Sequence, residues 1–476
     1  MIDMMLLLDN ESDEPLYAQL YQHIKREIVS GKIAANTRLP SIRALAAHLH
    51  IGRNTVESAY QQLIAEGYVR SRPRSGLFVV ELELDKLPDP SPRKDQLVEA
   101  SKPPEQPLAR YDFRYGNVDA ANFPLATWRK LSNQILQPEH AALFAYGDPQ
   151  GELELRHEIS DYLHVSRGVN SSPEQIVIGA GIQHLLGLSC GLIRSVAGNA
   201  LAMEEPGYDG VRTIFRHHGF DVHPVDLESD GLNLQQLYES QARAVYITPS
   251  HQFPYGIAMP LAKRMQLLTW ANDKNGIIIE DDYDSEFRYV GRPIPSLQSL
   301  DTNDRTVYLG TFSKCLLPSL RIAYMVLPPA LLELYHKHDY RLVDQTVSRF
   351  HQRTLALFMS KGHWEAHIRK MRNVYHKKQA ALIGSIRRLM GERTTVIGQD
   401  AGLHILLRVR NGMNERELIR TAAEAGVRVY AVSPFWARRS KSAASTVQIG
   451  FGGLSLKEID EGVQAMRRAW FGTTIN

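Results

Sequence analysis

The sequence predicts a multidomain protein in which a small N-terminal α+β domain precedes a large α/β domain with a C-terminal α+β subdomain. The first supporting observation is the length of 476 residues, which is too long for one ordinary domain. The second is a stretch at 81–109 that holds six prolines among charged residues and favours an extended linker. The third is the pattern on either side: short helices and a hairpin over 14–80, and alternating strand-like and helical runs over 110–476.

The charge of the chain is unevenly distributed. The whole chain carries a net charge of +3, whereas residues 16–80 alone hold nine Lys or Arg against three Asp or Glu. The remainder of the chain is therefore slightly acidic. A basic end on a slightly acidic body indicates that only the N-terminal domain contacts a polyanion.

Cysteine usage and hydropathy exclude several classes of protein. Cys190 and Cys315 have no paired spacing, so we expect neither a disulfide framework nor a metal site. No apolar run approaches the roughly 18 residues of a membrane-spanning helix. We therefore expect a cytoplasmic protein that does not contact a membrane.

The first two helices of the N-terminal domain are indicated by spacing and by a cap. Apolar side chains recur every four residues from Leu16 to Ile28, which marks one face of a helix that stops before Gly31. Ser41 follows Pro40 and is a typical N-cap for a second helix.

A third helix and a hairpin complete this domain. The turn at 50–52 separates the second helix from the third, which stops before Gly67, and residues 68–71 and 77–80 read as two short strands. A helix, a tight turn and another helix is the arrangement that places one helix in the major groove of DNA.

Several polar residues of this domain are suited to contact DNA. The start of the third helix would face base edges and phosphates, the second helix would reach a phosphate, and the hairpin loop would add basic side chains and a glycine that lets the backbone approach the duplex. The candidates are Arg43, Arg53, Asn54, Thr55, Arg72, Arg74 and Gly76.

Three short helices with surface arginines are common, so the pattern alone does not decide the function. The segments Pro15-Leu-Tyr, Leu39-Pro-Ser-Ile-Arg, Asn54-Thr-Val, Leu63-Ile-Ala-Glu-Gly-Tyr-Val and Gly76 together resemble the GntR-family winged helix along its whole length. The resemblance implies that this domain binds double-stranded DNA.

The large domain is predicted to contain a mainly parallel sheet covered by helices. Strand-like runs lie at 175–179, 200–203, 244–248, 276–280 and 306–310, with helical patterns between them such as 260–274. After Arg321 the pattern changes to a long helical region at 330–390, then to an α+β segment with a final helix near 456–470.

A lysine at the end of one of these strands suggests covalent chemistry with an aldehyde cofactor. Lys314 follows the strand at 306–310 in Thr311-Phe-Ser-Lys, and parallel sheets bind their ligands at the carboxyl ends of the strands. A Ser-Lys pair alone is weak evidence, because most surface lysines are only solvated.

Further groups around this lysine could hold such a cofactor. Asp281 and Tyr283 follow another strand, where a carboxylate can keep a pyridine nitrogen protonated, although a satisfied polar strand end is equally compatible with the pattern. Gly181 lies in a turn that exposes backbone N–H groups to a phosphate, and Arg321 can add a cation. Tyr208 could stack on the ring or could be a core tyrosine.

The segments GAGIQ, EEPGYDGV, TPSHQFPYG, EDDYDSEF and TFSKCLLPSLRIAY, taken in this order, resemble the fold-type I aminotransferases. Together with the winged helix, nearly the whole chain resembles the MocR/GabR family of regulators. The resemblance implies a homodimer with pyridoxal 5'-phosphate (PLP) bound as a Schiff base to Lys314, Asp281 on the pyridine nitrogen, Tyr283 on the phenolic oxygen and Tyr208 on the ring. It further implies a phosphate site formed by Gly181, Ile182, Gln183, Thr311, Ser313 and Arg321, with Tyr146 supplied by the partner subunit.

Two departures from the aminotransferase pattern concern the substrate. His251 and Gln252 occupy the loop where aminotransferases usually place an asparagine. An approximate alignment puts Thr446 where aminotransferases hold the substrate carboxylate with an arginine; Arg212, Arg438 and Arg439 are the possible substitutes.

The sequence therefore predicts a PLP-binding, DNA-binding transcriptional regulator that senses PLP or an amino compound as its small-molecule effector, and not an enzyme. An active PLP-dependent aminotransferase is the alternative, and a degenerate fold that only dimerises is a third possibility. The identity of the effector and of the regulated genes is left open.

Overall fold

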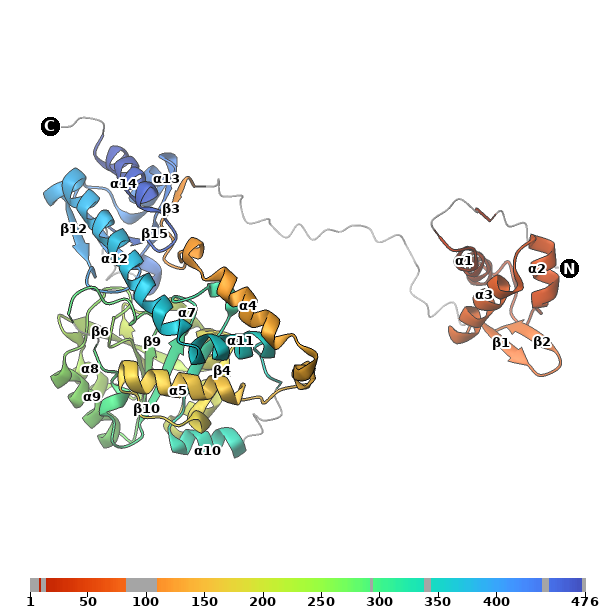
Figure 1. Cartoon of the computed structure of the whole chain (residues 1–476), viewed down its shortest axis with the longest axis horizontal. Helices are drawn as coiled ribbons and strands as arrows, with labels where there is room; N and C mark the ends of the chain where they lie inside the picture. Colours follow the sequence, from red (N-terminus) through yellow and green to blue (C-terminus); the bar gives the residue numbers. More distant parts are fainter. Residues whose placement is uncertain are drawn as a thin grey trace. The chain divides into compact units, whose positions relative to one another are not determined.

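The computed structural model describes residues 8–9, 14–82, 109–291, 294–337, 344–438 and 445–472 (Figure 1). The chain divides into two compact units, residues 1–106 and 107–476. Most of the predicted linker, residues 83–108, lies outside the described residues, and so does Arg439. Within the described part of the chain, no helix is long and apolar enough to cross a membrane.

The N-terminal unit contains three helices and one hairpin, as the sequence predicts. Their bounds are α1 (Leu16–Val29), α2 (Ile42–Leu49), α3 (Arg53–Ala65), β1 (Val69–Arg72) and β2 (Gly76–Val79). The Ser41 side chain accepts a hydrogen bond from the Ala44 N–H at 3.2 Å, which confirms the predicted N-cap of α2. His50 has a left-handed backbone conformation (φ 53°) just after α2, so the chain turns sharply into α3.

A small apolar core holds these helices together. Leu20 and Ile24 of α1 and Val56 and Leu63 of α3 are fully buried and belong to one cluster. Full burial of each such side chain contributes roughly 1.5–3 kcal/mol. Because this core takes up one face of α3, the opposite face is left to solvent.

The second unit is built on an eight-stranded sheet with the order β4-β11-β10-β9-β8-β5-β6-β7. The five predicted strands correspond to β4 (Ile176–Gly179), β5 (Ala200–Glu205), β8 (Ala244–Ile247), β9 (Ile277–Asp282) and β10 (Thr306–Thr311). Neighbouring strands from β10 to β6 pair in parallel, which confirms the mainly parallel sheet. The sequence did not predict β6 (Asp221–Glu228), β7 (Gly231–Leu232) or β11 (Ala323–Val326), and β11 is antiparallel to both of its neighbours.

Helices cover both faces of this sheet, because side chains alternate between the two faces along each strand. One face packs against α6 (Ile182–Ala197), α7 (Asp209–His217) and α10 (Pro329–Lys337). The other packs against α8 (Leu234–Glu239) and α9 (Leu261–Asp273), and against α4 (Leu125–Ile135), α5 (Leu153–Arg167) and α11 (Arg349–Ser360). Short 3-10 helices lie at Ala120–Asn122, Pro138–Phe144, Pro173–Gln175, Gln298–Leu300, Pro318–Leu320, Gly391–Arg393 and Ser433–Phe435.

The C-terminal part is a second, smaller α+β layer. Its four-stranded sheet has the order β12-β13-β16-β15, and β14 pairs separately with β3 near the start of the unit. The elements are β3 (Tyr111–Asp112), α12 (His363–Met390), β12 (Thr394–Ile397), β13 (His404–Val409), α13 (Glu415–Glu424), β14 (Val427–Arg428), β15 (Tyr430–Ala431), β16 (Thr446–Gly450) and α14 (Leu456–Phe471).

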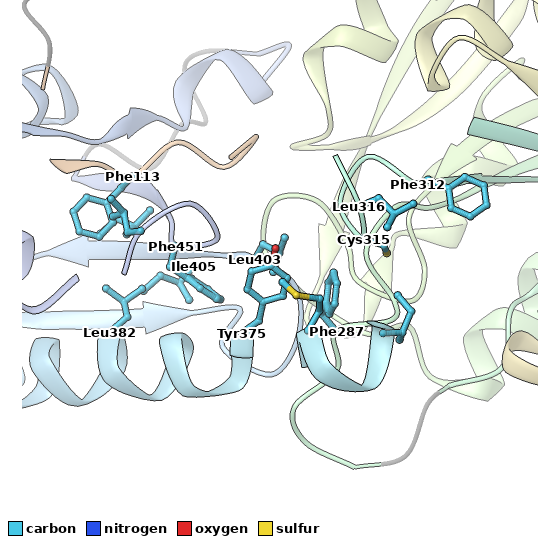
Figure 2. Packing of buried hydrophobic residues seen from close by; sticks show 14 of the residues in the cluster. Phe113, Phe287, Phe312, Cys315, Leu316, Tyr375, Leu382, Leu403, Ile405 and Phe451 are labelled. Carbon is cyan, nitrogen blue, oxygen red and sulfur yellow. The ribbon is translucent and has the colours of Figure 1, made fainter. Parts of the chain in front are cut away.

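One apolar core joins this layer to the large sheet. Figure 2 shows Tyr375 and Leu382 of α12 beside Ile405 of β13, and the same core continues to Phe312 and Cys315. Phe312 and Cys315 lie on either side of Ser313 and Lys314 in the sequence, and each is at most 2% exposed. The backbone on both sides of Lys314 is therefore held in the packed interior.

Candidate functional site

A cavity of about 340 Å³ lies at the carboxyl ends of β8, β9 and β10, beside the start of α6. Such a position is where open α/β sheets usually bind ligands. Nine of the eleven residues predicted to hold a cofactor line it: Ile182, Gln183, Tyr208, Asp281, Tyr283, Thr311, Ser313, Lys314 and Arg321.

Lys314 presents its amine to this cavity. Its Nζ lies 3.6 Å from the centre of the Tyr115 ring, and burial lowers the pKa of the amine to about 8, although Asp284 acts in the opposite direction. A lowered pKa increases the fraction of neutral amine near neutral pH, and the neutral amine is the nucleophilic form.

Asp281 offers a carboxylate oxygen that has no protein partner. Its Oδ2 accepts a hydrogen bond from the Tyr246 hydroxyl at 2.5 Å, whereas its Oδ1 is buried without a partner among the described residues. Burial raises the pKa of this carboxyl to about 7. A cationic N–H group in the cavity would satisfy the free oxygen and stabilise its charge.

The start of α6 forms an anion-binding corner of the cavity. Gly181 precedes α6 with φ +97°, and no side chain caps this helix end. A Cβ on Gly181 would collide with the Arg321 guanidinium, which donates to the Ala180 carbonyl at 3.0 Å. Thr311 and Ser313 add two hydroxyl groups 3.0 Å apart. Uncapped N–H groups, hydroxyls and a guanidinium together suit a phosphate.

The N-terminal unit presents its predicted DNA contacts on its surface. Arg53 begins α3 directly after Gly52, which caps this helix without a side chain. Arg43, Arg53, Asn54, Arg72, Arg74 and Gly76 are exposed, and Thr55 is half-buried. A basic helix end and an exposed hairpin are the two surfaces that a winged helix uses on a duplex.

The sequence analysis missed two arginines at this surface, Arg70 on the hairpin and Arg38 beside it. Arg70 and Arg72 both donate to the Asn36 side chain, at 2.9 and 3.2 Å. Arg72 also lies over the Phe78 ring at 4.5 Å. Arg38 lies against Gly76, where a Cβ would come within 3.0 Å of its Nε. Arg38 is far from the hairpin in the sequence and is brought to it by the tertiary structure. Only its position just before Leu39-Pro40 could have suggested it from the sequence.

Comparisons with known proteins cover both units. Residues 108–466 match the family of class I and II aminotransferases, and residues 16–79 match the gntR family of bacterial regulatory proteins. Among solved structures, LysN, an alpha-aminoadipate aminotransferase from Thermus thermophilus, is 25% identical with a TM-score of 0.67, over 76% of this chain and 92% of LysN.

Two relatives match nearly end to end. The chain is 43% identical over 471 residues to the "Uncharacterized HTH-type transcriptional regulator YhdI" of Bacillus subtilis, over 98% of each protein. It is 33% identical over 479 residues to the "Probable rhizopine catabolism regulatory protein MocR" of Rhizobium meliloti, over 98% of this chain and 96% of that one. The chain belongs to the MocR-type family of regulators. It is a DNA-binding transcriptional regulator with an aminotransferase-like domain.

Two residues predicted to hold the cofactor of this MocR-type regulator do not line the cavity. Gly181 lies directly behind its wall, at the start of α6. Tyr146 lies elsewhere, is 88% exposed and follows the short helix Pro138–Phe144. Arg349 fixes this segment by donating to the Ala142 and Ala145 carbonyls at 2.8 and 3.0 Å.

Tyr283 and the loop at 248–256 make hydrogen bonds that the sequence analysis did not predict. The Tyr283 ring lines the cavity, but its hydroxyl donates to the His251 carbonyl at 2.8 Å. His251 pairs with Asp284 at 2.9 Å, and Gln252 donates to the Pro206 carbonyl at 2.9 Å. The side chains of His251 and Gln252 therefore hold the residues around the MocR-type site in place, but they are not among the residues that line the cavity.

Six residues that line the cavity were missed by sequence reasoning: Tyr115, Gly116, Tyr246, Thr248, Phe253 and Pro318. Tyr115 comes from the segment after β3, 199 residues before Lys314 in the chain. Tyr246 and Thr248 lie at the carboxyl end of β8, a position that could have suggested them. Phe253 had no comparable local signal.

Proposed function

We propose that this MocR-type regulator binds PLP at Lys314 and that occupancy of the cavity alters how its winged helices bind DNA. The observation that carries the proposal is the coincidence, within one cavity, of a lysine amine, a buried carboxylate oxygen without a partner, and an open helix end beside a guanidinium. LysN, whose structure contains a phosphopyridoxyl compound, shares this fold.

Each of these groups matches one part of the cofactor. The Lys314 amine would join the aldehyde, Asp281 would accept from the protonated pyridine nitrogen, and Tyr208 would lie against the ring. Gly181, Ile182, Gln183, Thr311, Ser313 and Arg321 would hold the phosphate. When bound, PLP supplies a reactive carbonyl and an electron-withdrawing ring.

The proposal includes a homodimer. Leu136, Phe144, Tyr146 and Leu153 are 46–88% exposed and come from one short stretch of the chain, so they can form a shared apolar surface. A second copy of the chain would cover them and would place the two copies of Tyr146 near each other's phosphate sites. Two winged helices would then meet two half-sites on DNA in the cytoplasm.

The effector is either PLP itself or an amino compound that binds beside it. Either ligand shifts the regulator only if it binds one conformation more tightly than another. Couplings of about 1–3 kcal/mol are typical, which corresponds to a change of roughly 5–150-fold in DNA affinity.

The decisive experiment measures binding of the purified regulator to DNA from upstream of its own gene, without PLP, with PLP, and with PLP plus a panel of amines and amino acids. A change with PLP alone identifies the cofactor as the signal, and a change that requires one amino compound identifies that compound. The Lys314→Ala variant should lose the absorbance band of lysine-bound PLP. Unchanged absorbance and DNA affinity in this variant would contradict the proposal and favour a domain that only dimerises.

An active aminotransferase is the second candidate, favoured by the intact set of Lys314, Asp281 and Tyr283 in one cavity. It predicts steady transfer of an amino group from an amino acid to a keto acid. Steady turnover of an amino acid without any DNA binding would favour the aminotransferase over the proposed ligand-responsive regulator.

A further inference from the structure

Positive charge in the cavity comes from two lining side chains. Of the side chains that line it, only Lys314 and Arg321 are cationic. The inference rests on the proposed function, in which Lys314 joins the PLP aldehyde and Arg321 faces its phosphate. With both engaged, no lining cation among the described residues is left for a second ligand.

The two nearby arginines that could have substituted have other partners. Arg212 is buried, donates to the Phe435 carbonyl at 2.7 Å and lies 3.4 Å from the fully buried carboxylate of Glu205. Arg438 donates to the Pro224 carbonyl at 2.6 Å and lies 3.9 Å from Asp226. Withdrawing Arg212 from Glu205 would leave a buried anion without its partner, which is costly.

Two further arginines lie on the side of the C-terminal layer. Arg114 donates to the Tyr430 hydroxyl at 2.9 Å. Arg408 is exposed and lies four residues along β13 from His404, about 13 Å at the usual rise of a strand. The His404 ring packs 4.7 Å from the Tyr115 ring, and Arg408 lies toward the other end of β13, where it pairs with Thr446.

An uncharged side chain occupies the strand position that faces the cavity wall. Gly450 at the end of β16 lies directly against Tyr115, where a Cβ would come within 2.5 Å of the Tyr115 backbone. Gln448 is two residues earlier and therefore on the same face. It pairs with Leu406, which packs in one apolar cluster with Phe253 and Tyr283.

The sequence-based alignment placed Thr446, two residues before Gln448, at the position of the carboxylate arginine. Thr446 pairs with Arg408, two pairs farther from Tyr115 than Gln448. Gln448 is 4% exposed, and its Nε2 has no hydrogen-bond partner among the described residues. At this position β16 therefore carries a buried neutral amide donor and no charged side chain.

We propose that the ligand bound beside the cofactor is a primary amine with an uncharged, mainly apolar body, and that α-amino acids are rejected. The carboxylate of an α-amino acid would meet Tyr115 and Phe253 without a further cation among the described residues that line the cavity. It would also lie near Asp281 and Asp284, two buried acidic groups whose charges both act on the Lys314 amine. An unpaired charge placed against such a wall is strongly disfavoured.

The test compares ligands that differ only by a carboxylate, on the intact regulator loaded with PLP. The first pair is 2-phenylethylamine and L-phenylalanine, and the second is butylamine and L-norvaline. The absorbance change of the bound cofactor and the affinity for upstream DNA are measured as functions of ligand concentration. Free PLP with each compound controls for reaction in solution.

We expect each amine to act at a concentration about 10–100-fold lower than its amino acid, because a buried charged group without a partner costs at least as much as an unsatisfied polar group. If the amino acids acted at the same concentrations as the amines or at lower ones, the inference would be overturned. It would also be overturned if none of the four compounds changed the absorbance or the DNA affinity of a regulator that has taken up PLP. A regulator that takes up no PLP would instead overturn the proposed function.

A pair of variants tests the wall itself. Gln448→Arg should reduce the preference for the amine by about tenfold, because it supplies a cation, whereas the uncharged Gln448→Met should preserve the preference. The absorbance of bound PLP reports whether each variant is folded. An unchanged preference in a PLP-loaded Gln448→Arg variant would contradict the assignment of this strand as the wall.

Discussion

At the scale of the residue, the properties of the site come from burial. Lys314 and Asp281 are ordinary ionisable side chains whose pKa values move toward each other because both are removed from water. Such perturbed pairs in a cavity are typical of functional sites.

The lowered pKa of Lys314 predicts a pH dependence of cofactor loading. Only the neutral amine attacks the aldehyde, so the rate should rise about tenfold per pH unit below pH 8 and level off above it. Stopped-flow absorbance of the cofactor-free regulator mixed with PLP measures this rate, with Lys314→Ala as the unreactive control. A rate that continues to rise up to the ordinary lysine pKa would show that the amine is not desolvated.

The sequence could predict the residues of the site that follow apolar strands, because a strand and the polar group after it are local features. Lys314 and Asp281 were found in this way. Tyr115 and Phe253 could not be, since they reach the cavity only through tertiary packing. Gln448 was not singled out, because Thr446, two residues earlier, lies on the same face of the strand, so strand alternation does not distinguish the two positions.

At the scale of the element, the third helix and the hairpin are the parts of the winged helix that we expect to contact DNA. Helices of this unit were predictable from a four-residue apolar repeat and a cap. Strand β6 was not, because Pro224 lies within it and most of its side chains are not buried. Such features are tolerated near the edge of a sheet, where β6 is followed only by the two-residue strand β7.

Arg53 at the start of α3 is the residue of this element with the clearest expected effect. Arg53→Ala should weaken binding to the specific site by about 10–100-fold, because a contact to a base edge contributes roughly 1–3 kcal/mol. Fluorescence anisotropy with labelled DNA at several salt concentrations measures this. The absorbance of bound PLP should remain unchanged, and loss of both signals would identify Arg53 as structural.

At the scale of the whole molecule, the winged helix and the cavity proposed to bind the ligand lie in separate units of one chain. Residues 81–109, between the two, hold six prolines. If the proposed homodimer is the form that binds DNA, a ligand in the cavity can affect DNA binding by changing how the two copies of the chain assemble.

The exposed aromatic residues beside Tyr146 predict the surface on which two copies meet. Phe144→Glu should shift the regulator toward monomer, because Phe144 is 68% exposed and a charge there would be buried in the dimer. Analytical ultracentrifugation measures the change. Val165→Glu is a matched control, since Val165 is 86% exposed on α5; an equal effect of both variants would argue against a specific interface.

The antiparallel strand β11 has a consequence for how the chain can evolve. The backbone leaves the sheet after Thr311 and returns opposite it at Ala323, and within this excursion it carries both Lys314 and Arg321. In the proposed complex, the aldehyde end and the phosphate end of the cofactor would both be held by this one stretch of chain, so its length sets the distance between the two binding groups. Substitutions can accumulate in this stretch without changing its length. An insertion or deletion between Lys314 and Arg321 would change the distance between the two groups. We therefore expect the length of this stretch to be kept in any descendant that still uses the cavity.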